Sequence, residues 1–241
     1  MQRYFIATAS RAGAEIEITG GDYHHIKNVM RMRVKDRIIV CPGDGKAYFA
    51  EISGFGEKTV AARIIEEIPG DPEMRVKVTV AHGFTRSRKH EEAARRLAEL
   101  GAAAYLPVRM ERSVAKGESA AKRARLEAIA KEACEQSGRN RLLNILPPLS
   151  FVDFLDFSRD FPVKIYAYEE VGAAGGLRKI ASGLKDSPVL VLIGPEGGIA
   201  PNEARLLDEA GFIAVGLGPR ILRTETAPLY VMSVLAYETE L

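Results

Sequence analysis

The chain has 241 residues, of which 46% are hydrophobic and 27% charged, so it is long enough to bury one large core or two smaller ones. Its net charge of +2 excludes a strong overall attraction to nucleic acid, and any such binding must come from local clusters of Lys and Arg. Two distant cysteines without ligand spacing exclude a disulfide framework and a structural zinc site, and the apolar runs are too short for a membrane span, so we expect a cytoplasmic protein.

The first 70 residues carry the signals of short β-strands. Residues 14–20 alternate apolar and polar positions and are closed by two glycines. Residues 37–68 contain three further strand-like runs, which are separated by Pro-Gly-Asp-Gly and by Gly-Phe-Gly-Glu-Lys. Short strands at this spacing predict a small β-barrel domain over residues 1–70.

A short helix is predicted over residues 22–31, after the first of these strands. Asp22 is a suitable N-cap, because its carboxylate can accept a hydrogen bond from a backbone N–H of the first turn. Ile26, Val29 and Met30 follow the helical spacing that puts side chains on one face. The pattern therefore predicts a helix with one apolar face.

The sequence pattern changes at residues 69–72, where two prolines and a glycine stop any regular structure. Over residues 74–241, apolar runs alternate with helix-like stretches, which predicts an α/β domain with a parallel sheet covered on both faces. The expected strands are residues 76–82, 103–108, 163–168, 188–194 and 212–217. The expected helices are residues 88–101, 119–138, 201–211 and 227–241, with Gly101 and Gly138 ending the first two.

A glycine-rich turn, Gly-Pro-Glu-Gly-Gly at residues 194–198, lies between a buried strand and a helix. In open parallel sheets, ligands bind at the carboxyl ends of strands, where glycines let the backbone approach them closely. The pattern fits a tight connection as well as a ligand site, and it lacks the Lys-Ser/Thr of a triphosphate-binding loop. A second stretch, residues 217–228, is too long and too chemically mixed for a simple connection, which predicts a binding loop.

Five stretches of the chain together resemble the RsmE family of 16S rRNA uridine-N3 methyltransferases, which belongs to the SPOUT superfamily. In chain order they are HHIKNVMRMRVKD, AELGAAAYLPVRMERSV, EACEQSGRN, LIGPEGGIAPNEA and LGPRILRTETA. The resemblance implies a PUA-like RNA-binding β-barrel over residues 1–70 and a SPOUT α/β domain over residues 74–241. It also implies a deep trefoil knot in the C-terminal third of the chain.

The resemblance further implies a cofactor and a reaction. The cofactor is S-adenosylmethionine, and the reaction is methylation of N3 of a specific uridine in 16S rRNA, in the decoding region of the small ribosomal subunit. No metal is implied, because the sulfonium methyl group is already activated. The implied cofactor residues are Ile193, Gly194, Gly198, Leu217, Gly218, Ile221, Leu222, Arg223 and Thr226.

The chemistry at uridine N3 suggests which side chains act as catalytic residues. N3 carries a proton and is a weak nucleophile until that proton leaves, so the site must accept it or stabilise the anion of the base. Glu196 is one candidate acceptor, although a carboxylate that stabilises a helix N-terminus is an equally good interpretation. Arg223 or Arg139 would stabilise the uracil oxygens, and Arg139 also fits a solvated cation at a helix end. For Glu225 we favour an acid in the first turn of the last helix.

Clusters of basic residues predict where RNA binds. They occur at residues 24–37, 86–89, 109–116 and 139–141. A charge cluster is most often a solvated face. Four clusters near the predicted cofactor site favour a surface that contacts the phosphates of RNA, with binding that weakens as the salt concentration rises. The candidate contacts are Lys27, Arg31, Arg33, Arg112 and Arg139, of which Arg31 is the best single one.

The expected partners are 16S rRNA, within the assembled small subunit, and a second copy of the chain. The last helix carries a stripe that fits either core burial or the homodimer interface implied by the superfamily: Leu229, Met232, Ser233, Leu235 and Ala236. Two other functions stay open, an RNA ribose 2′-O-methyltransferase and an rRNA-binding assembly factor without turnover. The two predicted cofactor turns argue against the second, because an RNA clamp needs no adenosine pocket.

Overall fold

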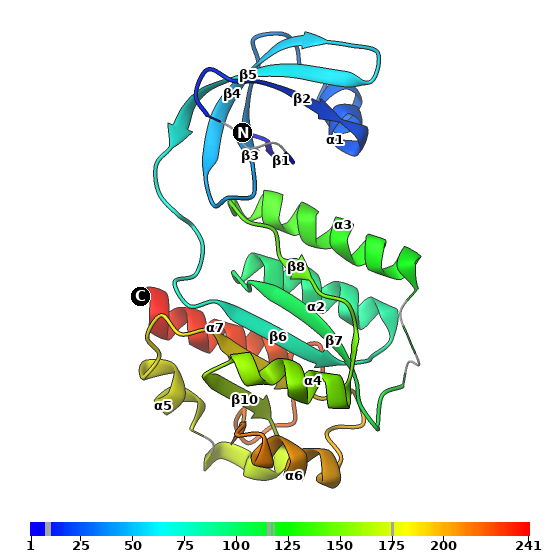
Figure 1. The fold of residues 1–241 in the computed structure, drawn as a ribbon, viewed down its shortest axis with the longest axis vertical. Helices are drawn as coiled ribbons and strands as arrows, with labels where there is room; N and C mark the ends of the chain where they lie inside the picture. The colour runs from blue at the N-terminus through cyan, green and yellow to red at the C-terminus, as the bar shows by residue number, and fades with distance from the viewer. Residues whose placement is uncertain (8–10, 115–116, 118, 175) are drawn as a thin grey trace. The chain divides into compact units, whose positions relative to one another are not determined.

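The computed structural model describes residues 1–7, 11–114, 117, 119–174 and 176–241 (Figure 1). The chain divides into two compact units. Unit 1 comprises Met1–Glu73 and Cys134–Leu142, and unit 2 comprises Met74–Ala133 and Leu143–Leu241. The sequence indicates a break near residue 72, but it gives no sign that a segment from the middle of the chain folds with the N-terminal residues.

Unit 1 contains one five-stranded sheet. Its strands are β1 (Arg3–Phe5), β2 (Glu15–Thr19), β3 (Arg37–Cys41), β4 (Ala47–Phe55) and β5 (Thr59–Ile68), in the order β1-β3-β4-β5-β2. β1 runs parallel to β3, and the other neighbouring strands are antiparallel. The buried isoleucines of β2 alternate with exposed polar residues, as the sequence predicts. The sheet curls into a half-barrel around an apolar core, and β1 and β2 form its two edges.

The helix after β2 differs from its prediction in where it begins and in its pitch. α1 (Gly20–His24) starts directly after the strand, so the last residue of β2 is the N-cap and Asp22 lies in the first turn. A π-helical turn, η1 (His25–Val29), follows, and a backbone N–H there donates to the carbonyl five residues back. This wider turn moves side chains away from a common face. Of the predicted apolar face only the isoleucine is buried, whereas Val29 and Met30 are exposed.

Unit 2 is built on a seven-stranded parallel sheet. Its strands are β6 (Val78–Gly83), β7 (Ala104–Arg109), β8 (Asn144–Ile145), β9 (Leu149–Ser150), β10 (Val163–Ala167), β11 (Val189–Ile193) and β12 (Ile213–Val215). They lie in the order β12-β10-β11-β6-β7-β8, and β9 also pairs with β7. The prediction of an α/β domain with a parallel sheet is thereby confirmed.

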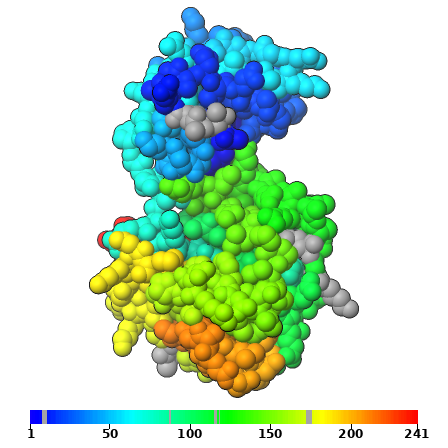
Figure 2. Space-filling view, in the orientation of Figure 1, coloured from blue at the N-terminus to red at the C-terminus, as the bar shows by residue number. Residues whose placement is uncertain are grey.

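Helices cover both faces of this sheet. They are α2 (Ser87–Glu99), α3 (Ala120–Gln136), α4 (Phe151–Phe157), α5 (Leu177–Ser182), α6 (Pro201–Glu209) and α7 (Ala227–Glu240), with short 3-10 helices η2 (Ser158–Asp160) and η3 (Glu169–Ala174). Figure 1 shows α4 in front of the sheet and α7 behind it, and Figure 2 shows α4 and α6 on the near surface of the unit. Because the sheet is covered on both faces, every residue of β6 and β11 is buried.

The direction in which the chain adds strands reverses between β6 and β11. From β6 the chain continues to β7 on one side of the sheet, and from β11 it continues to β12 on the other side. Such a reversal leaves a crevice at the carboxyl ends of the two strands, where ligands bind in open α/β sheets. β6 ends at Gly83 and β11 ends at Ile193, so these residues mark the expected place.

The helix ends follow the glycine signals of the sequence. Gly101 and Gly138 have φ angles of +83° and +77°, in the left-handed region that ends a helix and favours glycine. The trefoil knot implied by the family resemblance stays a prediction. None of the helices in the described part of the chain is long and apolar enough to cross a membrane.

Candidate active site

A cavity of about 580 Å³ lies at the carboxyl ends of the central strands of unit 2. One wall is the turn after β11, residues 193–199, and a second wall is the loop between β12 and α7, residues 216–224. Residues 167–169 at the end of β10, Lys89 of α2 and Ala227 of α7 complete the lining. The cavity therefore occupies the crevice that the strand order predicts.

The structure brings the two turns singled out in the sequence together at this cavity. The predicted cofactor residues that line it are Ile193, Gly194, Gly198, Leu217, Gly218, Ile221, Leu222 and Arg223. Thr226 is outside the lining and is exposed at the N-cap of α7. Glu196, the candidate proton acceptor, also lines the cavity. Lys89 and Glu169 line it too. The sequence places Lys89 only in the basic cluster at residues 86–89, and Glu169 was missed, because neither belongs to a cofactor motif.

Close backbone packing explains why this region is rich in glycine. A Cβ on Gly83, at the end of β6, would lie 2.5 Å from the Pro195 Cδ. Gly198 has a φ of +71°, and a Cβ there would lie 2.8 Å from a carboxylate oxygen of Glu169. Side chains at these positions would displace the turn after β11 or the carboxylate that faces it. The glycines thus give the cavity its wall.

Three charged side chains meet beside the cavity. The Lys89 Nζ lies 3.5 Å from a carboxylate oxygen of Glu196 and 3.1 Å from one of Glu225. Burial raises the pKa of Glu225, but hydrogen bonds from its own backbone N–H and from Lys89 outweigh burial, so the net pKa lies below its usual value. Glu225 is therefore held as a carboxylate paired with the ammonium group. It precedes Thr226, the N-cap of α7, so it does not lie in the first turn of the last helix, where the sequence places it.

The segment after β7 is fixed to the C-terminal part of the glycine-rich turn and to the start of α6. Arg112 donates from its Nη1 to the carbonyl oxygen of Gly197 at 3.1 Å. The preceding residue, Glu111, donates its backbone N–H to the buried Glu203 at 2.8 Å, and Glu203 also accepts from the backbone N–H of Ala200 at 3.2 Å. A predicted RNA-binding arginine is thus bonded to Gly197, a residue that lines the cavity.

A buried cluster next to the cavity was not predicted from the sequence. His82 of β6 and Tyr105 of β7 lie on neighbouring strands, with the His82 Nδ1 at 2.8 Å from the Tyr105 hydroxyl. His90 of α2 bonds to the same hydroxyl, and the His82 Nε2 lies 2.7 Å from the hydroxyl of Thr224. Burial lowers the pKa of His82 well below its usual value of 6.5 and lowers that of His90 to about 4.

These histidines predict a stability that falls in mild acid. Below pH 6.5 an unfolded histidine takes up a proton, whereas His90 in the folded chain stays neutral until about pH 4. The difference between the two pKa values corresponds to about 3 kcal/mol of unfolding free energy. This stability is present at neutral pH and is lost as the pH falls from 6.5 to about 4. Urea denaturation between pH 7.5 and 4.5 measures the loss.

The matched variant for this test is His90→Gln. Its amide oxygen can accept the backbone N–H of Thr85, as the imidazole does, but it does not titrate. We expect a flatter dependence of unfolding free energy on pH than in the wild type. Parallel curves for the two proteins would contradict the assignment.

Comparison with known proteins shows which family has this geometry. Residues 72–236 match the RNA methyltransferase domain, and residues 18–65 match the RNA methyltransferase PUA domain. A ribosomal RNA small subunit methyltransferase E of Bacillus subtilis is 41% identical over 251 residues, which cover 100% of this chain and 98% of the relative. The chain belongs to this RNA methyltransferase family.

Other members of the RNA methyltransferase family agree in sequence and in structure. The ribosomal RNA small subunit methyltransferase E of Mesomycoplasma hyopneumoniae is 30% identical over 90% of this chain and 91% of its own. The crystal structure of the same enzyme from Neisseria gonorrhoeae, bound to S-adenosyl methionine, has a TM-score of 0.88 at 29% identity, covering 98% of this chain and 97% of that one.

Three of the RNA-binding candidates of this methyltransferase are exposed on unit 1. They are Lys27, Arg31 and Arg33, in and after the π-helical turn. Arg31 has a φ of +53°, in the left-handed region that residues other than glycine adopt only rarely. Lys116, in the predicted cluster at residues 109–116, lies outside the described residues.

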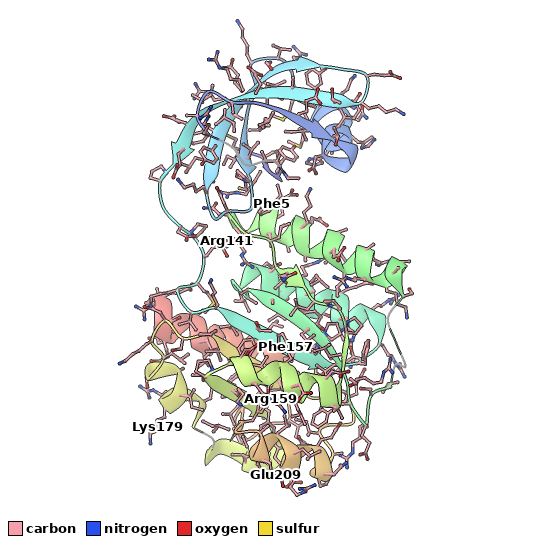
Figure 3. All side chains as sticks on the ribbon, in the orientation of Figure 1. Phe5, Arg141, Phe157, Arg159, Lys179 and Glu209 are labelled. Carbon is pink, nitrogen blue, oxygen red and sulfur yellow. The ribbon has the colours of Figure 1, made fainter. Side chains whose placement is uncertain are left out.

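The environment of Arg139 argues against its predicted role in RNA or uracil binding. Its side chain is 4% exposed, and its Nη2 lies 2.5 Å from a carboxylate oxygen of Glu73, which belongs to the same unit. The other oxygen of Glu73 accepts the backbone N–H groups of Asn140 and Arg141, each at 3.0 Å. Figure 3 labels Arg141, whose guanidinium also donates to the carbonyl of Asp44. A buried ion pair therefore accounts for Arg139.

Proposed function

We propose that this protein transfers a methyl group from S-adenosylmethionine to N3 of a specific uridine in 16S rRNA, in the decoding region of the small ribosomal subunit. The observation that carries the proposal is the meeting of residues 193–199 and 216–224 at one cavity. A protein that only clamped RNA would not need such a cavity. The relatives are named as rRNA methyltransferases, and the Neisseria structure contains S-adenosyl methionine, which supports both the substrate class and the cofactor.

The cavity fits an adenosyl group in size and in chemistry. Its volume of about 580 Å³ lies within the ~300–1,000 Å³ that is usual for small-molecule sites. Its glycines leave backbone amides accessible to a purine, and Leu217 and Leu222 offer apolar contacts to the ring. The carboxylate of Glu169 would accept hydrogen bonds from the ribose hydroxyls. When bound, the cofactor supplies an activated methyl group.

The residues of the chain must deal with the proton on uridine N3. Glu196 lines the cavity and is the proposed acceptor of that proton. As the proton leaves, negative charge spreads onto the uracil oxygens, where a nearby cation lowers the energy of the transition state. Lys89 and Arg223 both line the cavity, and each carries a positive charge that can act in this way. Arg139 has no part in this proposal, because it is buried against Glu73.

The RNA would be held by the exposed basic residues through its phosphates. Arg31→Ala is expected to weaken binding to a 16S rRNA fragment and to lower the slope of log affinity against log salt by about 1, because one phosphate contact is lost. Binding measured by fluorescence anisotropy at several salt concentrations checks this. Arg63→Ala removes an exposed arginine of β5, outside the cluster, and should leave the slope unchanged. Equal slopes for all three proteins would remove Arg31 from the interface.

The chain is further proposed to act as a homodimer on the assembled small subunit in the cytoplasm. Within α7, Met232 and Leu235 are fully buried, so core packing explains that part of the predicted stripe. Tyr230 and Tyr237 of the same helix are 43% and 66% exposed. Exposed tyrosines suit a protein interface. Sedimentation of the wild type and of a Tyr230→Ser, Tyr237→Ser variant tests this part of the proposal.

Two measurements on the purified protein test the proposed function. S-adenosylhomocysteine at about 100 times its Kd should stabilise the protein by about 2.7 kcal/mol, seen as a rise in melting temperature. Small subunits from a strain that lacks the enzyme should then gain one methyl group on incubation with S-adenosylmethionine, found by mass mapping on the base of a uridine. A methyl group on a ribose would favour the 2′-O-methyltransferase, and no ligand stabilisation would favour an assembly factor without turnover.

A further inference from the structure

A continuous chain of buried hydrogen bonds runs from α2 through the sheet to the cavity. It begins at the backbone N–H of Thr85, which donates to the His90 Nε2 at 2.9 Å. It passes through the Tyr105 hydroxyl to His82, as described above. It then reaches Thr224, whose hydroxyl donates to the carbonyl oxygen of Gly194 at 2.7 Å. His82 and Tyr105 are completely buried.

The α2 end of the chain fixes the tautomer of His90. A backbone N–H can only donate, so the His90 Nε2 must accept the bond from Thr85 and carries no proton. The ring proton of neutral His90 is therefore on Nδ1. From there it is donated to the oxygen of the Tyr105 hydroxyl.

The cavity end fixes the tautomer of His82 in the same way. The Gly194 carbonyl can only accept, so the single hydroxyl proton of Thr224 points to it. The Thr224 oxygen must then accept from the His82 Nε2, which places the ring proton on Nε2. The bare Nδ1 of His82 accepts the proton of the Tyr105 hydroxyl. Every bond in the chain thus points from α2 toward the cavity.

This direction decides where the one proton of Thr224 goes. If His82 took its other tautomer, the bare Nε2 would compete with the Gly194 carbonyl for that proton. Thr224 belongs to the loop before α7, and Gly194 belongs to the turn after β11. The bond between them therefore joins the two walls of the cavity, and its strength depends on a hydroxyl group in β7.

We propose that His82 and Tyr105 are positioning residues of the methyltransferase, which hold the two walls of the cofactor cavity together by fixing the hydrogen bond from Thr224 to Gly194. The inference rests on the proposed function, because it assigns the cavity to the cofactor. Neither residue would contact the cofactor or the RNA. Both act through Thr224, which lines the cavity.

Nuclear magnetic resonance tests the direction of the chain without any ligand. The protein contains 4 histidines, so the ring nitrogens can be assigned individually with single substitutions. We expect His82 with its proton on Nε2 and His90 with its proton on Nδ1. The opposite tautomer at His82 in the wild type would overturn the proposal.

Affinity for S-adenosylhomocysteine tests the effect on the cavity. Tyr105→Phe and Thr224→Val each leave buried polar atoms without a partner and should weaken binding roughly tenfold, with a higher KM for S-adenosylmethionine and an unchanged KM for RNA. Thr224→Ser keeps the hydroxyl and should restore most of the affinity. Tyr166→Phe is the control, because it removes the hydroxyl of another buried tyrosine of the same sheet. That hydroxyl is bonded to Asp208 and is not part of the hydrogen-bond chain.

The outcomes separate this inference from the proposed function. If Tyr105→Phe loses thermal stability as Tyr166→Phe does but binds S-adenosylhomocysteine with wild-type affinity, the hydrogen-bond chain has only a structural role and the inference is overturned. If the wild-type protein itself does not bind S-adenosylhomocysteine, the proposed function fails, and the purpose assigned to the chain fails with it.

Discussion

Glu196→Gln is expected to bind S-adenosylhomocysteine within about threefold of the wild-type affinity and to transfer methyl groups roughly 10²–10⁴ times more slowly. Glutamine has the size and shape of glutamate, so the turn after β11 should keep its conformation. Its amide cannot accept the proton that leaves uridine N3. Single-turnover methylation of small subunits at saturating cofactor measures the rate, and calorimetry measures the affinity.

The matched control for this prediction is Glu225→Gln. Lys89 contacts both carboxylates, at 3.5 Å for Glu196 and 3.1 Å for Glu225, but only the first of the two lines the cavity. The control thus changes the partner of the same ammonium group and keeps the proposed proton acceptor. We expect its turnover to stay close to wild type. Normal turnover in Glu196→Gln would exclude the mechanism, and equal slowing in both variants would indicate that the charge of Lys89 matters instead.

Glu73→Gln should lower the free energy of unfolding by about 3–5 kcal/mol, as the loss of one partner from a buried ion pair does. Glu73 accepts two bonds from the Arg139 side chain and two more from backbone N–H groups. Without the carboxylate, the buried guanidinium of Arg139 loses the charge of Glu73 and the bonds to its two oxygens. Urea denaturation of the full chain measures the loss.

A double variant distinguishes the ion pair from a general loss of packing. Glu73→Leu combined with Arg139→Met replaces both charges by apolar groups, and we expect it to recover much of the stability that Glu73→Gln loses. Its binding to rRNA should keep the wild-type salt dependence, because Arg139 is buried in unit 1. A double variant as unstable as the single one would indicate a general loss of packing, and a reduced salt slope would favour the role in RNA binding that the sequence indicates.

Features whose signal lies within one short stretch were predictable from the sequence. Such local patterns include the continuous apolar runs of β6 and β11 and the glycines that follow α2 and α3. The two turns that line the cavity are also local patterns. β1, β8 and β9 are too short to produce such a pattern. α1 begins earlier than predicted because the two glycines after β2 form the start of the helix and no separate turn precedes it. The π-helical turn depends on a bond five residues back, which a 3.6-residue spacing does not reveal.

The buried polar clusters were not predictable, because their members are far apart in the sequence. His82, His90 and Tyr105 each look like a core residue and meet only when β6, β7 and α2 pack together. Arg139 lies in a basic segment, and its ion pair with Glu73, 66 positions away, has no local signal in the sequence. A histidine at the end of the apolar run of β6 is the one local hint, and by itself it does not name a partner.

Unit 1 is built from two separate segments of the chain, and this has a consequence for biosynthesis. A nascent chain that ends at residue 73 has a complete five-stranded sheet, but it lacks the backbone N–H groups and the guanidinium that Glu73 binds. These emerge from the ribosome only after Leu142, when β6 and β7 have already been synthesised. The two units therefore cannot mature strictly one after the other, as domains in tandem do. A transplant of the N-terminal unit into another protein must carry both of its segments.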